Sequence, residues 1–207
     1  MNSFNSQFSL IETHLSESNT SLRSVLAQRR VVVLMGLTNE RFNDILQAFN
    51  DLILLSTYDL RGVGVEIVGN YLKFASSGKG YTKTRLQVGS SGSTMVQVDF
   101  SICYDEFYQV PRLFFRVSTE DGSLAMDNCP SVLGVRKEMG IIYDMHIVTN
   151  EPWYTIHPCE MYTFMEEMLG PEVDDLSYLK SWFGVYGIGA VFSNVGYRPG
   201  IDTAKTE

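Results

Sequence analysis

The run Val96-Gln97-Val98-Asp99-Phe100-Ser101-Ile102-Cys103 alternates apolar and polar residues. Successive side chains of a strand point to opposite faces of a sheet, so this pattern predicts a strand with one buried face. The run from Arg112 to Val117 repeats it, with Leu113, Phe115 and Val117 on the core side. The two strands therefore predict an antiparallel hairpin, joined by a turn between Tyr104 and Pro111, around which the rest of the fold is arranged.

The segments before this hairpin predict one helix and further strands. Thr38 can cap a helix, and apolar residues follow at spacings of three and four as far as Leu55. Strands are expected over 58–67 and 71–74, with a Gly69-Asn70 turn between them. Residues 76–94 hold two clusters of Gly and Ser and are expected to form a flexible loop.

The segments after the hairpin predict a short strand within 141–149 and two helices. One helix follows Cys159 and stops at Gly170-Pro171, and Asp174 and Asp175 open the other. The expected fold class is α+β, an antiparallel meander flanked by an N-terminal helix and C-terminal helices. Three parts are expected: a weakly ordered extension over 1–30, a single domain over 31–195 and a flexible segment over 196–207.

The bulk composition excludes several classes of protein. The chain has 207 residues, 44% hydrophobic content and a net charge of -8, which disfavours nucleic acid and anionic membrane as partners. No apolar run approaches the roughly 20 residues of a membrane span, and the N-terminus lacks the order of a secretory signal. The three cysteines show no zinc spacing, so no metal site is expected. A reducing compartment, the cytoplasm, is the expected location.

The run Trp153-Tyr154-Thr155-Ile156-His157-Pro158-Cys159 holds the candidate nucleophile. Proline keeps the residue before it extended and tends to begin helices, so Cys159 is expected near the first turn of a helix. The unpaired N–H groups at that end favour a thiolate. Cys159 is therefore the candidate catalytic residue, with a buried structural thiol as the alternative.

Several strings resemble the autophagy branch of the ubiquitin-conjugating enzymes. Tyr108-Gln109-Val110-Pro111-Arg112-Leu113-Phe114-Phe115-Arg116, followed by Glu120-Asp121-Gly122, is similar to the hairpin of that branch, and His157-Pro158-Cys159 is similar to its active-site triplet. Gly69-Asn70-Tyr71-Leu72 and the run from Tyr178 to Phe183 resemble its early strand and its C-terminal helix. The resemblance covers roughly residues 38–192 and favours the member that transfers its modifier to a protein over the sister enzyme that transfers to lipid.

The resemblance implies an acyl-transfer enzyme. Cys159 would carry a ubiquitin-like modifier of the autophagy-related protein 12 type as a thioester and pass it to a lysine of an acceptor of the autophagy-related protein 5 type. An activating enzyme of the autophagy-related protein 7 type would spend the ATP, so no cofactor is expected. The histidine–proline–asparagine triplet of the wider superfamily is absent, so no motif identifies the group that stabilises the tetrahedral intermediate.

Other residues are candidates for shaping the site or binding partners. His157, Pro158, Tyr108 and Tyr154 are expected near Cys159, with plain structural packing as the alternative. Phe114 and Arg116 lie on the outward phase of their strand and are expected to bind a partner, with a solvated face as the alternative.

Two other functions are weighed against the conjugating enzyme. One is a catalytically silent scaffold of the same fold. The other is a cysteine hydrolase that pairs Cys159 with His146 or His157. His157 is two residues from the cysteine in an extended run, so its ring is expected to point away.

Overall fold

The computed structural model describes residues 37–60, 63–89, 95–170 and 172–199. The expected extension over 1–30 lies outside these residues. Within them, nine strands form a sheet in the order β7-β8-β5-β4-β3-β2-β1-β9, with β6 paired to β5. The bounds are β1 Thr57–Leu60, β2 Val63–Phe74, β3 Gly80–Val88, β4 Val96–Asp105, β5 Val110–Thr119, β6 Gly122–Leu124, β7 Ile141–Met145, β8 Pro152–Ile156 and β9 Val195–Arg198.

The predicted hairpin is confirmed at the centre of the sheet. β4 and β5 pair antiparallel, with Phe100 opposite Phe115 and Ser101 opposite Phe114. Phe100, Leu113, Phe115 and Val117 are fully buried, as the alternation requires. Burying each such side chain contributes roughly 1.5–3 kcal/mol.

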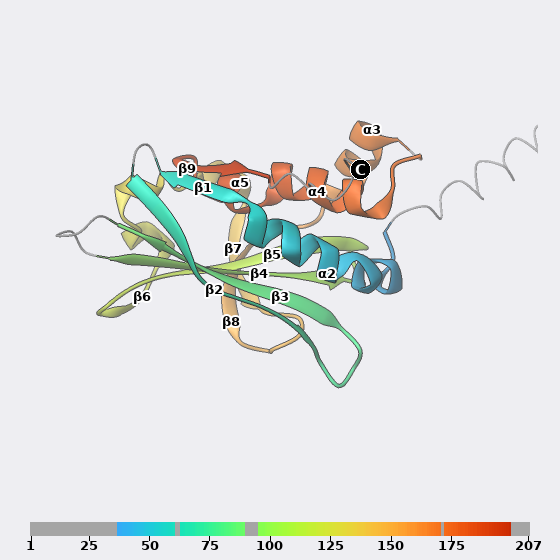
Figure 1. The fold of residues 1–207 in the computed structure, drawn as a ribbon, viewed down its shortest axis with the longest axis horizontal. Helices are drawn as coiled ribbons and strands as arrows, with labels where there is room; N and C mark the ends of the chain where they lie inside the picture. Colours follow the sequence, from blue (N-terminus) through green and yellow to red (C-terminus); the bar gives the residue numbers. More distant parts are fainter. Residues whose placement is uncertain (1–36, 61–62, 90–94, 171, 200–207) are drawn as a thin grey trace, which may run out of the picture. The chain divides into compact units, whose positions relative to one another are not determined.

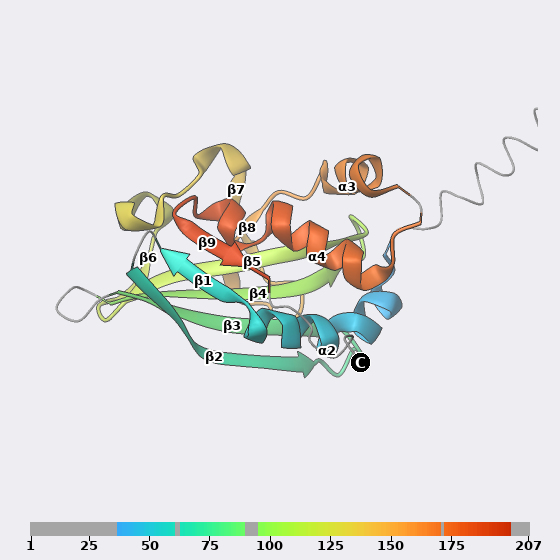
Figure 2. The same cartoon turned by 45° about the horizontal axis from the view of Figure 1, so that its top comes forward.

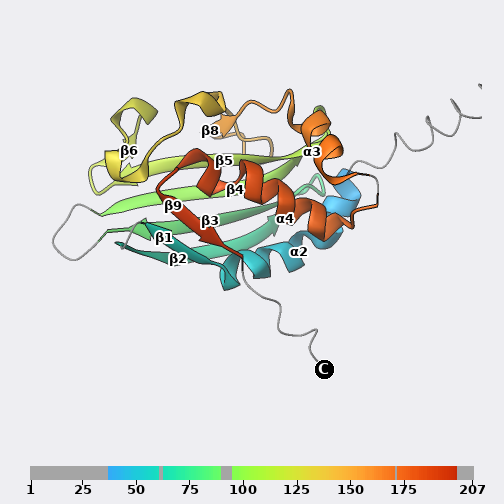
Figure 3. The same ribbon diagram turned by 90° about the horizontal axis from the view of Figure 1, so that it is seen from above.

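Four α-helices are described: α2 Asn39–Leu55, α3 Met161–Leu169, α4 Asp175–Tyr186 and the short α5 Ile188–Val191. Three short 3-10 helices, Met126–Asn128, Ser131–Leu133 and Lys137–Met139, lie between β6 and β7. Thr38 caps α2 by accepting the N–H of Arg41, and Asp174 caps α4 by accepting the N–H of Ser177, as the sequence predicts. The helices α2 and α4 pack on one face of the sheet (Figures 1 and 3). Their buried side chains and the inner face of β3, β4 and β5 form the main core. The predicted α+β class is confirmed.

The opposite face of the sheet carries a second, smaller core. Cys103, Phe114 and Trp153 are buried there, with Tyr81, Ile147 and Val148 packed against them. The loop between β7 and β8 lies on this side, away from α4 (Figure 1). Both faces of the central strands are therefore covered.

The expectation of a flexible loop over 76–94 is wrong for residues 80–88. These residues form β3, which lies between β2 and β4 (Figure 2). Thr82 and Thr84 occupy buried positions, while Lys83 and Arg85 pair with Asp99 across the strands. Threonine is β-branched and favours strands, but it is not counted as apolar. The alternation was therefore hidden by polar residues on both faces.

Two further expectations differ from the structure. Gly69 and Asn70 do not form a turn, because β2 runs through them with an irregularity of register between Ile67 and Gly69. The flexible segment expected over 196–207 is wrong for residues 196–198, which belong to β9 and pair with β1. An edge strand of four residues carries too short a pattern to be recognised from composition.

Candidate active site

The candidate nucleophile lies between a strand and a helix. β8 ends at Ile156, and His157, Pro158, Cys159 and Glu160 connect it to α3. The N–H of His157 donates to the carbonyl of Gly140 (3.2 Å), and the N–H of Met161 donates to the carbonyl of Pro158 (3.1 Å). Pro158 and Met161 are buried whereas Cys159 is exposed. The segment is thus anchored on both sides and presents its thiol to solvent.

The ring of His157 turns back onto the cysteine. Its Nδ1 atom accepts the backbone N–H of Cys159 at 3.3 Å, so the expectation that the ring points away is wrong. A side-chain acceptor three bonds from Cα can close a small turn onto the N–H two residues later, as Asn and Asp do. Since Nδ1 accepts, the hydrogen of the neutral ring is on Nε2, which is then a donor.

The β4–β5 turn brings one predicted residue to this loop. The ring of Tyr108 meets the ring of His157 edge to face, with centroids 6.0 Å apart. Phe107 in turn packs edge to face on Tyr108, with centroids 4.9 Å apart. The turn and α3 lie at the same end of the sheet (Figures 2 and 3). Two segments about 50 residues apart in the sequence therefore meet beside Cys159.

Tyr154 lies elsewhere. Its ring stacks on Phe115 and packs on Tyr143, with centroids 6.2 and 4.9 Å away. It lines an open pocket of about 430 Å³ together with Arg116, Leu124 and Glu151. Among the interactions of the described residues, none joins Tyr154 to Cys159 or His157.

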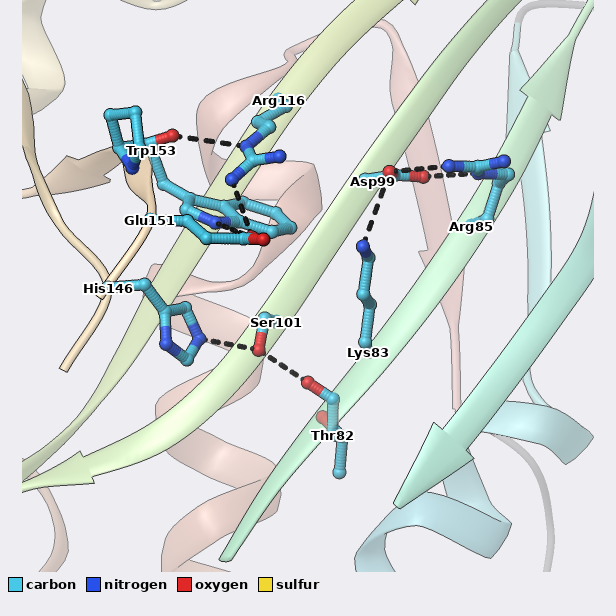
Figure 4. Close-up of polar contacts among 10 residues, drawn as sticks. Thr82, Lys83, Arg85, Asp99, Ser101, Arg116, His146, Glu151 and Trp153 are labelled. Carbon is cyan, nitrogen blue, oxygen red and sulfur yellow. Dashed lines mark hydrogen bonds and ion pairs between the residues drawn. The ribbon is translucent and has the colours of Figure 1, made fainter. Parts of the chain in front are cut away.

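The expectation that Phe114 is an exposed contact residue is wrong. Phe114 has no exposed area and packs 4.6 Å from the ring of His146. Arg116 is partly exposed but engaged: its guanidinium lies 3.9 Å from the ring of Trp153 and donates to the carboxylate of Glu151 (2.9 Å). Figure 4 shows Arg116 beside Trp153 and Glu151. Phe114 on the outward phase of β5 therefore belongs to the second core, against which Ile147 and Val148 of the β7–β8 loop pack.

His146 is a structural residue of this second core. It is 1% exposed. Its Nδ1 accepts the N–H groups of Val148 and Thr149 (both 3.2 Å), and its Nε2 donates to the hydroxyl of Ser101 (2.8 Å), which donates to the carbonyl of Thr82 (Figure 4). Burial lowers the pKa of His146 to about 4. Both ring nitrogens are engaged in hydrogen bonds within the second core, so the structure does not support His146 as the base of a cysteine hydrolase.

The three cysteines differ sharply in their surroundings. Cys103 is fully buried, and burial raises the pKa of its thiol to about 12. Cys129 is half-buried, and burial raises the pKa of its thiol to about 11. Cys159 alone is exposed. A thiol must be accessible and able to ionise to act as a nucleophile, so this arrangement favours Cys159.

Sequence reasoning missed the residues that build the turn next to the site. The carboxylate of Asp105 accepts the N–H groups of Phe107 and Tyr108, and Arg112 donates to the same carboxylate at 3.0 Å. Arg112 also donates to Asp144 on β7. An Asp followed by polar and aromatic residues between two strands is a turn signal, but its second anchor on β7 is visible only in three dimensions.

Within the ranges that the structure describes, no three His, Cys, Asp or Glu side chains are gathered closely enough to hold a metal ion. In those same ranges no helix is long and apolar enough to cross a membrane.

Comparison with known proteins agrees with the resemblance seen in the sequence. The sequence model of the family described as "Autophagocytosis associated protein, active-site domain" matches residues 75–193, which include Cys159. A protein of Candida albicans named ubiquitin-like-conjugating enzyme ATG10 is 28% identical over 172 residues, 80% of this chain and 93% of that protein.

More distant relatives and structures are similar over parts of the chain. Proteins of the same name match from Arabidopsis thaliana (33% identical over 104 residues, 43% of this chain and 46% of that protein) and Homo sapiens (26% over 110 residues, 47% and 50%). A solved structure titled "Crystal structure of Autophagic E2, Atg10" aligns over 77% of this chain and 98% of that chain, with 14% identity and a TM-score of 0.48. That spatial likeness is too distant to support a functional argument.

Proposed function

Because this chain belongs to the family of autophagocytosis-associated proteins that share this active-site domain, and resembles autophagy-related protein 10, we propose that it carries a ubiquitin-like modifier on Cys159. It is a ubiquitin-like protein transferase of the conjugating-enzyme type and acts in autophagy. The proposal adds the residue that bears the modifier and the identity of the partners. The modifier is of the autophagy-related protein 12 type, and the acceptor is a lysine of a protein of the autophagy-related protein 5 type.

The reaction consists of two acyl transfers. In the first, the Cys159 thiolate attacks the thioester that joins the modifier to an activating enzyme of the autophagy-related protein 7 type. A new thioester forms at Cys159 and the thiol of the activating enzyme leaves. In the second, the amine of the acceptor lysine attacks the same carbonyl carbon, an amide forms, a proton leaves the amine and the Cys159 thiolate is released. ATP is consumed by the activating enzyme, so neither transfer requires a cofactor at Cys159.

The exposure of Cys159 is the observation that carries the proposal. It is the one exposed thiol of three, and it lies in a loop anchored by Gly140 and Pro158. A modifier attached there meets no covering segment among the described residues, whereas Cys103 lies within the second core. The free thiols suit a reducing compartment, and we place the protein in the cytoplasm.

The test is thioester formation with purified components. The full chain is incubated with activating enzyme, modifier and ATP and resolved with and without a thiol reductant. We expect one band of increased mass that the reductant removes. Cys159→Ser should give a more resistant ester, and Cys159→Ala should give no adduct. Cys103→Ala and Cys129→Ala serve as controls and should charge normally.

Other outcomes would support other functions. An adduct that persists in Cys159→Ala and disappears in Cys103→Ala contradicts the choice of nucleophile. A folded protein that forms no adduct is the result expected of a scaffold. Transfer from the charged protein to phosphatidylethanolamine vesicles, without transfer to the acceptor protein, would identify the lipid-directed sister enzyme.

We further propose that the catalytic domain spans 31–195 together with β9, and that residues 1–30 are an extension not needed for the chemistry. A chain beginning at Val31 should fold and accept the modifier at the rate of the full chain. Normal folding with loss of charging would show instead that residues 1–30 bind the activating enzyme.

A further inference from the structure

The β4–β5 turn presents an aromatic side chain to solvent. Phe107 is 85% exposed, more than any other large hydrophobic residue of the described chain. Isolated apolar residues on a surface are normal. Phe107 differs because it does not stand alone: its ring packs on Tyr108, whose ring packs on His157.

The turn is built to hold this side chain in one place. The carboxylate of Asp105 accepts the N–H groups of Phe107 (2.9 Å) and Tyr108 (3.2 Å). Asp105 is itself buried and held by Arg112. Gln109 adopts a φ of 57°, the left-handed region that a residue other than glycine seldom enters. A left-handed residue at the end of a short hairpin loop returns the chain to the second strand, so Gln109 and the bonds to Asp105 together fix the conformation of the turn that presents Phe107.

The turn leads directly to the nucleophile. From Phe107 the aromatic contacts pass through Tyr108 to His157, whose Nδ1 accepts the N–H of Cys159. Cys159 and His157 are exposed and Tyr108 is half-buried. Cys159 and Phe107 are therefore linked through the contacts of His157 and Tyr108, and each of these four side chains is at least partly open to solvent.

We propose that Phe107 and Tyr108 form a platform for the extended C-terminal segment of the modifier while that segment is bonded to Cys159. The inference rests on the proposed function. The thioester fixes the last carbonyl carbon of the modifier at Sγ of Cys159, so the residues before it must lie on the neighbouring surface. The ring centroids of His157 and Tyr108 are 6.0 Å apart and those of Tyr108 and Phe107 are 4.9 Å apart. An extended chain advances about 3.3 Å per residue, so about four or five residues before the thioester are enough to cover these steps.

The chemistry of the platform defines its ligand. Two aromatic faces next to an extended backbone favour an apolar side chain in the modifier segment, a few residues before its end. The flanking Lys79–Glu106 ion pair (3.0 Å) borders this surface without adding net charge. The acceptor protein has no covalent tether to this place, which favours the modifier segment as the occupant.

The experiment compares Phe107→Ser with Tyr143→Ser in the full chain. Tyr143 is also an exposed aromatic (65%) but lies on β7, packed on Tyr154. Single-turnover charging is measured against the concentration of charged activating enzyme, and alkylation of Cys159 by iodoacetamide is measured without any partner. We expect Phe107→Ser to lower the apparent second-order charging rate about tenfold, with alkylation and melting temperature unchanged. Tyr143→Ser should change none of these, and Phe107→Leu should retain most of the rate.

A coupled substitution identifies the occupant. Apolar residues among the last five of the modifier are replaced by Ser. These replacements in the modifier should lower the charging rate strongly with the wild-type chain and only slightly with Phe107→Ser. Additive losses would overturn the proposal, as would normal charging of Phe107→Ser with slower discharge onto the acceptor. If the wild-type chain forms no thiol-sensitive adduct on Cys159, it is the proposed function that fails.

Discussion

The Nδ1 atom of His157 accepts the backbone N–H of Cys159 at 3.3 Å. This contact fixes the backbone of the cysteine relative to an imidazole that also packs on Tyr108. We therefore propose that His157 is a positioning residue: its ring restrains the loop that carries the thiol and gives the loop a contact with the β4–β5 turn.

His157 can be tested by variants that keep or remove the acceptor. His157→Asn retains an acceptor at the same distance from Cα, whereas His157→Ala removes it. One hydrogen bond contributes about 1 kcal/mol, so we expect charging of His157→Ala to fall about fivefold and that of His157→Asn to fall less. Charging rates and the width of the pH profile are the measurements. Equal losses in both variants would show that the ring acts through Nε2 and not through the turn.

Phe114 should affect stability and not partner binding. It is fully buried beside His146, with Arg112 stacked on its ring at 4.8 Å. Phe114→Ala should lower the free energy of unfolding by about 3–5 kcal/mol, measured by urea denaturation. The exposed Phe107→Ala is the matched control and should change it by less than about 0.5 kcal/mol. A stable Phe114→Ala that discharges slowly onto the acceptor would restore the contact role.

Arg112 joins the turn to the edge of the sheet. Its side chain is 5% exposed and bridges Asp105 and Asp144. Arg112→Met leaves the buried carboxylate of Asp105 without its cation and should cost about 3–5 kcal/mol. Arg85 also pairs with a buried carboxylate, that of Asp99, but its own side chain is 44% exposed and Lys83 stays 3.9 Å from Asp99. Arg85→Met leaves Asp99 with a cation and should therefore cost less than Arg112→Met. The free energy of unfolding of both variants is measured by chemical denaturation at pH 7. Equal decreases in the two variants would contradict the prediction.

His146 should make the protein less stable in acid. Because burial lowers its pKa from 6.5 to about 4, the unfolded chain binds a proton at this residue before the folded one does. The contribution of His146 to the free energy of unfolding is therefore fully present above about pH 6.5. It is lost as the pH is lowered toward 4, which reduces the free energy of unfolding by up to about 3 kcal/mol. Glu151 opposes the shift, while Arg116, Lys83 and Arg112 reinforce it.

The matched variant for this prediction is His146→Asn, whose side-chain oxygen can still accept the N–H groups of Val148 and Thr149. Urea denaturation between pH 7.5 and 4.5 should show a smaller loss of stability in this variant than in the wild-type chain. Parallel curves for the two proteins would assign the acid sensitivity to other groups.

Local pattern was sufficient where one residue type dominated one face of an element. The alternation in β4 and the capping residues Thr38 and Asp174 predicted their elements, because strand period and cap chemistry are properties of a few consecutive residues. β3 was missed because Thr82 and Thr84 face the core while Lys83 and Arg85 face Asp99. Lys83 and Arg85 pair with Asp99 on β4 and Thr84 bonds to Asn70 on β2, contacts between strands that a local pattern cannot reveal.

By itself, the sequence determined that Cys159 follows His157 and Pro158 between an extended segment and a helix, since proline restricts the backbone on both sides of it. It also determined that Phe114 points away from Leu113. Only the tertiary structure decided what lies on that side: the β7–β8 loop folds over β5 and buries Phe114. Likewise, strand pairing placed Tyr108 against His157 and Tyr154 against Phe115. Contacts between distant segments depend on how the chain packs as a whole, and no short run of residues contains that information.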